Sequence, residues 1–537
     1  MLLEKPAFPQ FSFFKTSNPA FLFILALGSM EVPVFIGFRP NTGIFALGSL
    51  VAFLIFLRLF QRHSFSTVLP VILNQKFCSF LFGWVALGWI VLAVLKYYSL
   101  DYYIWDIGIF SNNIINLLES GRYFSSVLGI HGFADHFTPN LILLAPFFKI
   151  APTVLWLAFL KLTAFLVTTW FLYKLGIAVL GKQSVWIYLA PILWLINKYY
   201  AFTLRVEFHP SSLAPPFIVA AFYFASLKKF SSMVVCLIIL LGFKEHLSLI
   251  WLSLGGFLMG EKNYKAAVFC AGTGLAAGFL TYFVIMPAFF EGVGESLHHQ
   301  SRFAIFEQIP RKFELLGWCL LSVGLIPLVE WKNWLMIIPA FGLTWVTKDP
   351  PMLELNYYYY DISITVVVVS VIYAVRKLQF SSVSNPFSPS IMWILRVGLL
   401  MCILLVNTYT PQQTVVRRIP TESHRKILEE IRQYREELET GKELWLDDQI
   451  GIHFIRFPHL KALPMGTIKS YQSLLDAKEE RSVVFLKDPE MSNLATGVHP
   501  RLLADLENLV HQGCYRKRSE YKNLLIFEAA GHCIIQK

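Results

Sequence analysis

Long apolar runs separated by short polar segments dominate the chain from residue 20 to residue 407. A helix that crosses a bilayer needs about 20 mostly apolar residues, or fewer when it is packed inside a bundle. On that criterion the pattern predicts an α-helical polytopic membrane protein with about 13 transmembrane helices. The predicted helices cover residues 20–38, 43–60, 79–97, 153–175, 184–199, 213–227, 231–243, 246–260, 264–287, 314–330, 333–347, 360–376 and 391–407.

Two segments interrupt this pattern. Residues 98–152 are too long for a turn, and they contain two amphipathic stretches, "DIGIFSNNIINLLESG" and "HFTPNLILLAPFFKI", that suit helices lying in the membrane interface. Residues 411–537 carry the charged helix "KILEEIRQYREELETG" and then the strand-like pieces "ELWLDD", "SVVFLK" and "NLLIFEAAG". We therefore expect an N-terminal segment (1–78) with two extra helices, a membrane domain (79–410) and a small soluble α/β domain (411–537).

The composition supports a membrane protein, since 55% of the residues are hydrophobic and only 15% are charged, against roughly 25% charged in soluble domains. The net charge of +11 comes from Lys and Arg that stand singly or in pairs, which does not suggest nucleic-acid binding. Most of them fall in alternate loops, so the positive-inside rule places the N-terminus in the cytoplasm and the C-terminal domain outside it. Arg311 and Lys312 count against this orientation, although their loop is longer. The supporting residues are Arg58, Arg62, Lys76, Lys182, Lys228, Lys229, Lys262, Lys265, Arg376 and Lys377.

The cysteines and the common motifs exclude several classes of function. None of the seven cysteines forms a CxxC pair, and five lie in apolar runs as small buried side chains. Cys514 and Cys533 lie in the soluble domain, where an extracytoplasmic location would allow a disulfide bond. The chain has no Walker sequence, no GxGxxG after a strand and no HExxH, so ATPase, dinucleotide-binding and zinc-protease functions have no supporting motif.

Polar residues gather at the predicted outer ends of the helices. They occur in the stretches "DYYIWDIGIF", "ADHFTP", "RVEFHP", "FKEH" and "ELNYYYYDIS". Ionisable residues are costly at membrane depth and usually pair or line a polar cavity, so we expect one cavity that opens outward. The residues in question are Asp101, Asp106, Asp135, His136, Arg205, Glu207, His209, Lys244, Glu245, His246, Glu354, Tyr357, Tyr358, Tyr359, Tyr360 and Asp361.

Each of these stretches also has a purely structural interpretation. Asp106 and His136 suit the caps of interfacial helices. His209, followed by proline, suits the first turn of a helix. These interpretations stay open at the level of the sequence.

The same holds for the remaining two stretches. Lys244 and Glu245 suit a structural ion pair, or a lysine whose ammonium reaches the headgroups. The tyrosine run around Tyr359 suits an aromatic belt at the membrane interface as well as a platform for a substrate.

The order "DIGIF…HFTPNLILLAPFF…FHPSSLAPPFIVAAFY…GFKEHLSLIWLSLG" resembles a bacterial family of uncharacterised polytopic membrane proteins, grouped as a domain of unknown function. That family is similar to the GT-C glycosyltransferases. The resemblance covers residues 80 to 375 and, more loosely, the C-terminal domain. It implies a GT-C-like helical bundle in the bacterial inner membrane and transfer of a sugar, usually from a polyprenyl-phosphate donor, on the extracytoplasmic face.

The resemblance also assigns roles to residues of the first loop and of the "FHP" stretch. Such enzymes carry a catalytic acidic residue in the first outer loop, which corresponds here to Asp106. His136 matches an "HFSP"-like motif, and Glu207 with His209 matches the "FHP" region. A divalent cation would fit Asp106, Glu207 and His209, although no ligand spacing demands one.

Lys244 and Glu245 match a "KED" motif of the family, in which this chain has His246 where the family has aspartate. The departure puts in doubt any role of that aspartate as a metal ligand or base, although histidine serves in either role.

Sugar transfer from a phosphate needs two kinds of group. A carboxylate removes the proton of the acceptor hydroxyl, and Asp106 is the candidate. Cations stabilise the charge that builds on the departing phosphate, and Lys244 and Arg205 are the candidates. The leading hypothesis is therefore an inverting membrane glycosyltransferase with Asp106 as its base.

Two other classes of function compete with this hypothesis. A transporter or lipid flippase would place charges near the bilayer midplane and would pair discontinuous helices. A non-catalytic scaffold of the cell envelope would use the C-terminal domain as its binding part.

Overall fold

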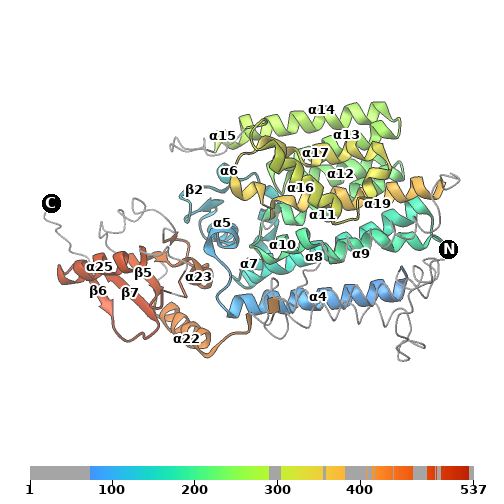
Figure 1. Cartoon of the computed structure of the whole chain (residues 1–537). Helices are drawn as coiled ribbons and strands as arrows, with labels where there is room; N and C mark the ends of the chain where they lie inside the picture. The colour runs from blue at the N-terminus through green and yellow to red at the C-terminus, as the bar shows by residue number, and fades with distance from the viewer. Residues whose placement is uncertain are drawn as a thin grey trace, which may run out of the picture.

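The computed structural model describes residues 73–289, 304–354, 358–380, 407, 414–415, 418–438, 441–463, 481–489, 491–492 and 498–530. The helices predicted at 20–38 and 43–60, and all but the last residue of the helix predicted at 391–407, lie outside the described residues. The described part consists of a helical membrane domain with a small sheet domain at one end (Figure 1).

Three helices in the described part of the chain are long and apolar enough to cross a membrane. They are α4 (Gln75–Tyr98), α8 (Leu155–Leu180) and the continuous helix Tyr264–Ala288, which comprises α14 (Tyr264–Leu280), a π-helical turn and α15 (Met286–Ala288). The ten predicted helices that fall on described residues all contain apolar helix, so their helical character is confirmed. The predicted number of spanning helices stays a prediction.

The other helices of the membrane domain are shorter, and several end inside the bundle. A helix of 12 residues is about 18 Å long, little more than half the thickness of the hydrocarbon core. They are α5 (Ile109–Ser120), α6 (Gly132–Asp135), α7 (Ala145–Ile150), α9 (Leu189–Ile196), α10 (Lys198–Arg205), α11 (Pro215–Ser226), α12 (Phe230–Leu241), α13 (Ser248–Gly260), α16 (Ile309–Leu321), α17 (Trp334–Ala340), α18 (Gly342–Val346) and α19 (Asp361–Phe380).

Helices α9 and α10 form one path that is broken at Asn197. The Asn197 side chain accepts hydrogen bonds from the backbone N–H groups of Tyr199 and Tyr200 and so caps α10. The Trp194 indole donates to the backbone carbonyl of Phe165, which is ten residues into α8, about 15 Å from its start. The sequence predicted a helix over 184–199, whereas the chain continues outward to Arg205 after this break.

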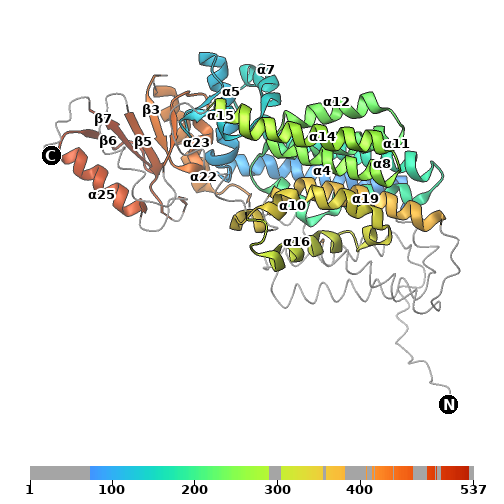
Figure 2. The same cartoon turned by 90° about the horizontal axis from the view of Figure 1, so that it is seen from above.

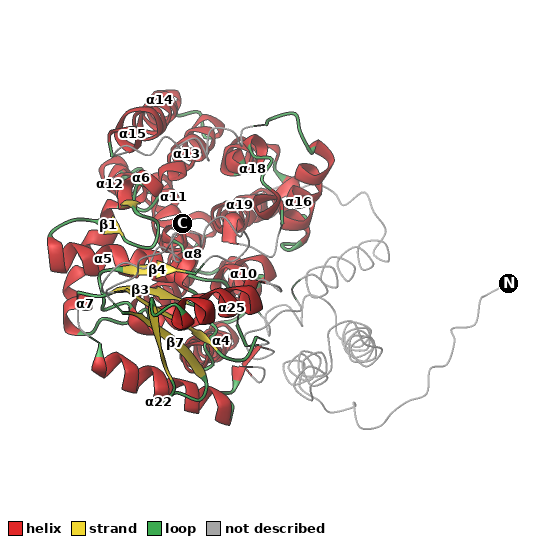
Figure 3. Ribbon diagram, turned by 90° about the vertical axis from the view of Figure 1, so that its left-hand side faces the viewer, coloured by secondary structure: helices red, strands yellow, loops and turns green. Residues whose placement is uncertain are grey.

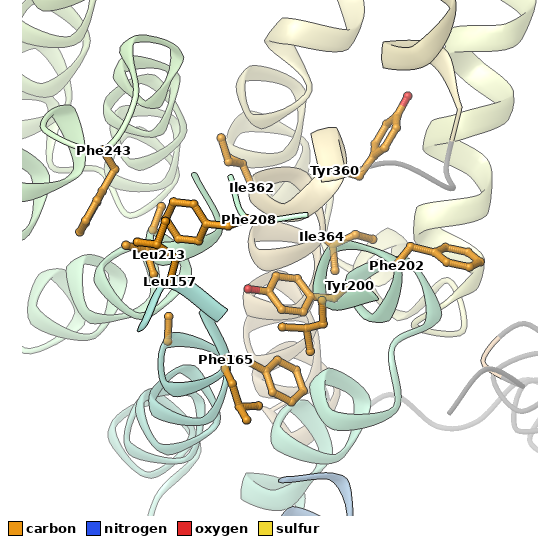
Figure 4. Close-up of a cluster of buried hydrophobic side chains, with 14 of the residues drawn as sticks. Leu157, Phe165, Tyr200, Phe202, Phe208, Leu213, Phe243, Tyr360, Ile362 and Ile364 are labelled. Atoms are coloured by element: carbon orange, nitrogen blue, oxygen red, sulfur yellow. The ribbon is translucent and has the colours of Figure 1, made fainter. Parts of the chain in front are cut away.

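Aromatic and aliphatic side chains fill the centre of the bundle around the break (Figure 4). The rings of Phe165 and Tyr200 stack with centroids 5.3 Å apart. Phe208 and Ile364 are fully buried in the same cluster. The valine-rich middle of α19 is buried on all sides and packs against this core.

A buried lysine satisfies the carbonyls at the outer end of this path. The Lys161 ammonium donates to the carbonyl oxygens of Thr203, Val206 and Glu207 at 3.2, 2.7 and 3.3 Å. These carbonyls lie at or beyond the end of α10, where a helix leaves acceptors without partners. Lys161 is six residues into α8, so this turn of the chain lies about 9 Å below the end of that helix.

The first outer loop differs in part from the prediction. Helix α5 was predicted to lie in the membrane interface, but its polar residues Asn112, Asn113 and Asn116 are buried. Asn112 Oδ1 accepts from the backbone N–H of Ser126, and Asn116 donates to the carbonyl of Phe124, so the amphipathic pattern serves packing inside the loop. Phe124–Ser125 (β1) pairs antiparallel with Ile130–His131 (β2).

Helix α7 and the 3₁₀ turn before it (Pro139–Leu144) keep the character expected of an interfacial segment. Leu143, Phe147 and Ile150 are exposed along one side. Such a row of apolar side chains at the end of a membrane domain suits contact with lipid.

The C-terminal domain is a five-stranded mixed sheet in the order β4-β3-β5-β7-β6. Strand β3 pairs in parallel with β4 and β5, and β7 pairs antiparallel with β5 and β6. The elements are α22 (Glu422–Glu437), β3 (Glu443–Leu446), α23 (Asp448–Gly451), β4 (Leu460–Ala462), β5 (Arg481–Leu486), α25 (Val498–His511), β6 (Tyr515–Arg518) and β7 (Leu524–Ala529).

Alternation along β5 explains why helices cover both faces of this sheet. Val483 and Phe485 pack in the cluster that contains residues of α25, whereas Val484 and Leu486 pack in the cluster that contains residues of α22. The predicted α/β character is confirmed, and Figure 2 shows α25 and α22 against the sheet. Cys514, before β6, is disulfide-bonded. Cys533 lies outside the described residues, so the disulfide bond that the sequence allows between these two cysteines is left open.

The C-terminal domain and the first outer loop lie at the same end of the bundle (Figure 1). Figure 3, viewed from that end, shows β3 and β4 beside α5. The loops that carry Lys182, Lys228 and Lys262 follow the opposite ends of α8, α11 and α13. Lys312 is no topology signal, because it is fully buried and its ammonium donates to the carbonyls of Ala304, Ile305 and Trp345.

Close packing between α13 and α17 gives a test of the fold. A Cβ atom at Gly256 would overlap the carbonyl oxygen of Leu335, whereas one at Gly272 in α14 would meet nothing within 4 Å. We expect Gly256→Ala to destabilise the protein by about 1–3 kcal/mol through overpacking. The matched control Gly272→Ala should be neutral or slightly stabilising.

The measurement is the thermal unfolding midpoint of both variants and of wild type in the same mild detergent. Equal midpoints for the two variants would contradict the predicted contact between α13 and α17.

Candidate functional site

A cavity lies at the outer end of the short helices, beneath the first outer loop. Tyr282, which lines it, is six residues before the end of the Tyr264–Ala288 helix, so the cavity reaches about 9 Å below that end. A cavity is therefore present where several of the polar stretches converge, deeper than the helix end, and its outward orientation stays a prediction. Its lining residues are His136, Lys244, Glu245, His246, Tyr282, Leu343, Val346, Thr347, Met352 and Tyr359.

Asn140 fixes the first loop to the end of α12. Its backbone N–H donates to the carbonyl of Gly242 at 2.9 Å, and its side-chain amide donates to the carbonyl of Ile239 at 2.7 Å. A Cβ atom at Gly242 would overlap the Asn140 side chain, so this close approach requires glycine. The "HFTPN" stretch and the "FKEH" stretch are thereby held together.

Glu245 joins these two stretches. Its carboxylate accepts from the backbone N–H of Phe137 at 3.2 Å, and one oxygen lies 3.2 Å from Nδ1 of His136. Nδ1 of His246 lies 3.9 Å from the same oxygen. His136 is thus part of the site and more than a helix cap, and His246 lies beside Glu245 at the place where the family motif has aspartate.

Lys244 contacts His209 and not Glu245. Its ammonium lies 3.1 Å from Nδ1 and 2.9 Å from Nε2 of His209, and near-equal distances to both nitrogens place it over the imidazole ring. Among the described residues, no carboxylate oxygen lies within 4 Å of this ammonium. Lys244 is only 4% exposed, so neither the predicted ion pair with Glu245 nor the snorkelling interpretation describes it.

His209 combines a structural and a site role. Pro210 begins the 3₁₀ turn Pro210–Leu213, as the sequence indicated. The His209 ring nevertheless turns into the site, with its centroid 5.5 Å from that of His136. Ser211 donates to Oδ2 of Asp361 at 2.7 Å and lies 3.4 Å from Nδ1 of His209, which ties the ring to the start of α19.

Asp106 lies in the π-helical turn Ile104–Gly108 that precedes α5. Neither helix uses it as an N-cap, because those positions are Tyr103 and Gly108. In the part of the chain that the structure describes, its carboxylate makes no hydrogen bond or ion pair. π-helical turns of this kind occur frequently at functional sites.

Burial raises the pKa of Asp106 to about 6, because desolvation disfavours the charged carboxylate. The nearby positive charges of Lys244, His136 and Lys161 lower this pKa, and the negative charge of Asp135 raises it. Asp106 is therefore within electrostatic range of the Lys244 ammonium although the two groups are not paired.

Glu207 and Arg205, both predicted to bind substrate, point away from the cavity. Glu207 Oε1 lies 3.4 Å from the ammonium of Lys96 on α4, which also lies 3.7 Å from Asp101. The Arg205 guanidinium lies over the ring of Phe202, 5.3 Å from its centre. These residues form a second polar cluster between α4 and α10, and the candidate cation ligand Glu207 is separated from His209.

Tyr359 lines the cavity as predicted, and its neighbour Tyr360 is fully buried with its hydroxyl donating to the carbonyl of Met352. Both rings therefore face the protein and not an aromatic belt. Among the described residues, no group of three or more His, Cys, Asp or Glu side chains is arranged to hold a metal ion.

Several residues of the site carry no local motif in the sequence. Ser211, Tyr282 and Asn140 are ordinary residues until the fold brings them together. Lys96 and Lys161 did carry a signal, because a lysine inside an apolar run at membrane depth needs a partner.

The family model described as "Predicted membrane protein (DUF2079)" matches residues 96–440 of the chain. The chain belongs to this family. The resemblance to an uncharacterised polytopic membrane family is thus confirmed. No curated protein matches the chain.

Two solved structures are similar to this DUF2079 protein. They are ArnT from Cupriavidus metallidurans bound to undecaprenyl phosphate, and the same protein in the apo state. Each has a TM-score of 0.49 and 10% sequence identity, and the alignments cover 83% and 84% of this chain and 98% and 99% of ArnT.

The pKa of Asp106 is open to direct measurement. A carbodiimide reacts with protonated carboxyl groups, and a pKa raised to about 6 keeps Asp106 protonated up to that pH. We expect its labelling, followed by peptide mass spectrometry, to have a midpoint near pH 6.

The exposed Glu429 of α22 serves as the reference for reagent efficiency in the same samples. Labelling of Asp106 that is already lost at about pH 4.5 would show an ordinary, solvated carboxylate and contradict the partly buried position of this side chain.

Proposed function

We propose that this protein is an integral membrane glycosyltransferase of GT-C type that moves a sugar from a polyprenyl-phosphate donor to a cell-envelope acceptor on the extracytoplasmic face. Asp106 is the base that receives the acceptor proton, and Lys244 binds the phosphate. His136, His209, Glu245, His246 and Tyr359 form the walls around the donor.

One observation carries this proposal: the buried ammonium of Lys244 lines the cavity, and the partly buried carboxylate of Asp106 lies within electrostatic range of it without pairing with it. Lys244 is held over His209, and Asp106 has no hydrogen-bond partner among the residues that the structure describes. Leaving two opposite charges unpaired in a low-dielectric environment costs free energy. A donor phosphate beside Lys244 and an acceptor hydroxyl beside Asp106 would together satisfy both groups.

The chemistry is a single displacement. The acceptor oxygen attacks the anomeric carbon as the bond from that carbon to the phosphate oxygen breaks, and the acceptor proton passes to Asp106. The polyprenyl phosphate leaves with the electron pair of the broken bond, and its new charge is stabilised by the Lys244 ammonium. The product is a glycosylated acceptor with inverted configuration at the anomeric carbon.

The position of the site suits a lipid-linked donor. The cavity is about 9 Å below the ends of the long helices, and the exposed apolar side of α7 lies in the same outer loop. A prenyl chain that stays in the bilayer would thereby reach the cavity from the side. The basic loops at the opposite end and the disulfide bond of Cys514 both favour an extracytoplasmic location for the site and the C-terminal domain.

The transporter or flippase alternative has one observation in its favour, which is the break at Asn197 between α9 and α10. Against it, the break is capped and packed, and residues 366 to 369 of α19 are fully buried beside it. A non-catalytic scaffold would retain no donor lipid during purification, and Asp106→Asn would not change the lipids that co-purify with it.

The phosphate-binding role of Lys244 is tested by mass spectrometry of lipids that co-purify in mild detergent. We expect wild type to retain a polyprenyl phosphate and Lys244→Met to lose it by at least about tenfold, because the variant keeps the side-chain volume and removes the charge. Lys332→Met, a partly buried lysine at the opposite end of the bundle, is the matched control.

Only bulk phospholipid in all three preparations would remove the support for a polyprenyl-phosphate donor. Added undecaprenyl phosphate, as a defined probe, should rebind to wild type and to Lys332→Met alone.

The role of Asp106 is tested by the identity of the retained lipid. Asp106→Asn removes the base and leaves Lys244 in place, so we expect the variant to retain the sugar-loaded donor, while wild type retains the free polyprenyl phosphate left after transfer. The mass difference between the two lipids would identify the sugar.

Asp505→Asn in α25 is the control, since that side chain lies in the C-terminal domain away from the site. The same lipid in wild type and Asp106→Asn would rule out the proposed base.

A further inference from the structure

The C-terminal domain contacts the turn that carries Asp106. The backbone N–H of Ile104, the first residue of the π-helical turn, donates to Oδ1 of Asp448 at 2.7 Å. Both residues are buried, because Ile104 has no exposed surface and Asp448 is 3% exposed. A Cβ atom at Gly451 would lie 2.7 Å from Cδ1 of Ile104, so α23 approaches the turn as closely as glycine allows.

Asp448 follows β3, the strand whose two neighbours β4 and β5 are both parallel to it. The chain leaves β3 towards β4 and then crosses to β5 on the other side. In open α/β sheets this point, outside the carboxyl ends of the strands, is where ligands bind. Here that position is occupied by Ile104 of the same chain.

Two further contacts hold the loop on both sides of Asp106. Before it, the Arg418 guanidinium lies 3.0 Å from Oδ1 of Asp101. After it, Oγ of Ser126 accepts from the backbone N–H of Leu460, the first residue of β4, at 3.0 Å. The C-terminal domain therefore fixes the loop at residues 101, 104 and 126.

We propose that Asp448 is a positioning residue for Asp106, so that the C-terminal domain is part of the catalytic apparatus. The first N–H groups of a helical turn have no acceptor within the turn, and the Asp448 carboxylate supplies one through a charge-assisted hydrogen bond. Asp106 is two residues further along the same turn. The catalytic meaning of this contact rests on the proposed function, whereas its effect on the environment of Asp106 does not.

The experiment compares the pH profile of Asp106 carbodiimide labelling in the full-length wild type and in Asp448→Ala, Asp448→Asn and Asp505→Ala. Without an acceptor for the backbone N–H of Ile104, the π-helical turn becomes less rigid and the Asp106 carboxylate becomes more solvated. We expect the labelled fraction of Asp106 at pH 6 to fall roughly fivefold in Asp448→Ala, which corresponds to a midpoint about one pH unit lower.

Asp448→Asn keeps an oxygen that accepts from the Ile104 N–H, so it should restore most of the wild-type profile, and Asp505→Ala should not change it. A wild-type profile in Asp448→Ala would overturn the proposal. If Asp448→Ala does not fold, Gly451→Val is used instead, because the added side chain displaces Ile104. An unchanged pH profile of Asp106 labelling in that variant would also overturn the proposal.

Lipid retention separates this proposal from the proposed function. Asp448→Ala leaves Lys244 and His209 in place, so it should retain undecaprenyl phosphate as wild type does while its Asp106 profile shifts. A shifted profile in a protein that retains no polyprenyl phosphate in any variant would support the positioning role and count against the glycosyltransferase.

Discussion

Backbone carbonyls that end inside the bundle, away from water, are the constraint on which the rest of this structure depends. In a bilayer each such group must find a partner within the protein, since leaving one unsatisfied costs several kcal/mol. Lys161 donates to three carbonyls at or beyond the end of α10, Lys312 donates to three more around α16 and α18, and Asn140 donates to a carbonyl near the end of α12. These partners allow helices to end partway through the membrane.

The site follows from those early helix ends. Because α11, α12 and α13 are each only 12 or 13 residues long, the loops beside them lie below the outer ends of the long helices. His209 precedes α11 and Lys244 precedes α13, so the two meet inside the bundle and not on its surface. A lysine at this depth costs roughly 2.5–3.5 kcal/mol on insertion scales, and the proposed phosphate site would give a reason for that cost.

Hydrophobic patterning could predict where the apolar helices lie, that the polar stretches converge and that the C-terminal domain is α/β. It could not predict the depth of the cavity, because depth depends on which helices end early, and that is decided by distant partners such as Lys161 and Asn140. It also could not separate the cavity residues from Glu207 and Arg205. Glu207 and His209 are two residues apart, a spacing that would place both side chains on one face of a regular extended stretch, yet "RVEFHP" is irregular and directs Glu207 towards Lys96 on α4 and His209 towards Lys244.

The proposed function also gives a reason for the contact between the C-terminal domain and the loop that carries Asp106. A phosphate needs a cation in a low-dielectric environment, where electrostatic attraction is strong, and Lys244 in the membrane domain provides it. In the proposed mechanism the acceptor comes from the cell envelope, and its base, Asp106, lies on the loop that the C-terminal domain contacts. Arg418, Asp448 and Leu460 hold that loop from the outside. The C-terminal domain thus holds the loop that carries Asp106 in place, as helix packing holds Lys244 in place inside the membrane domain.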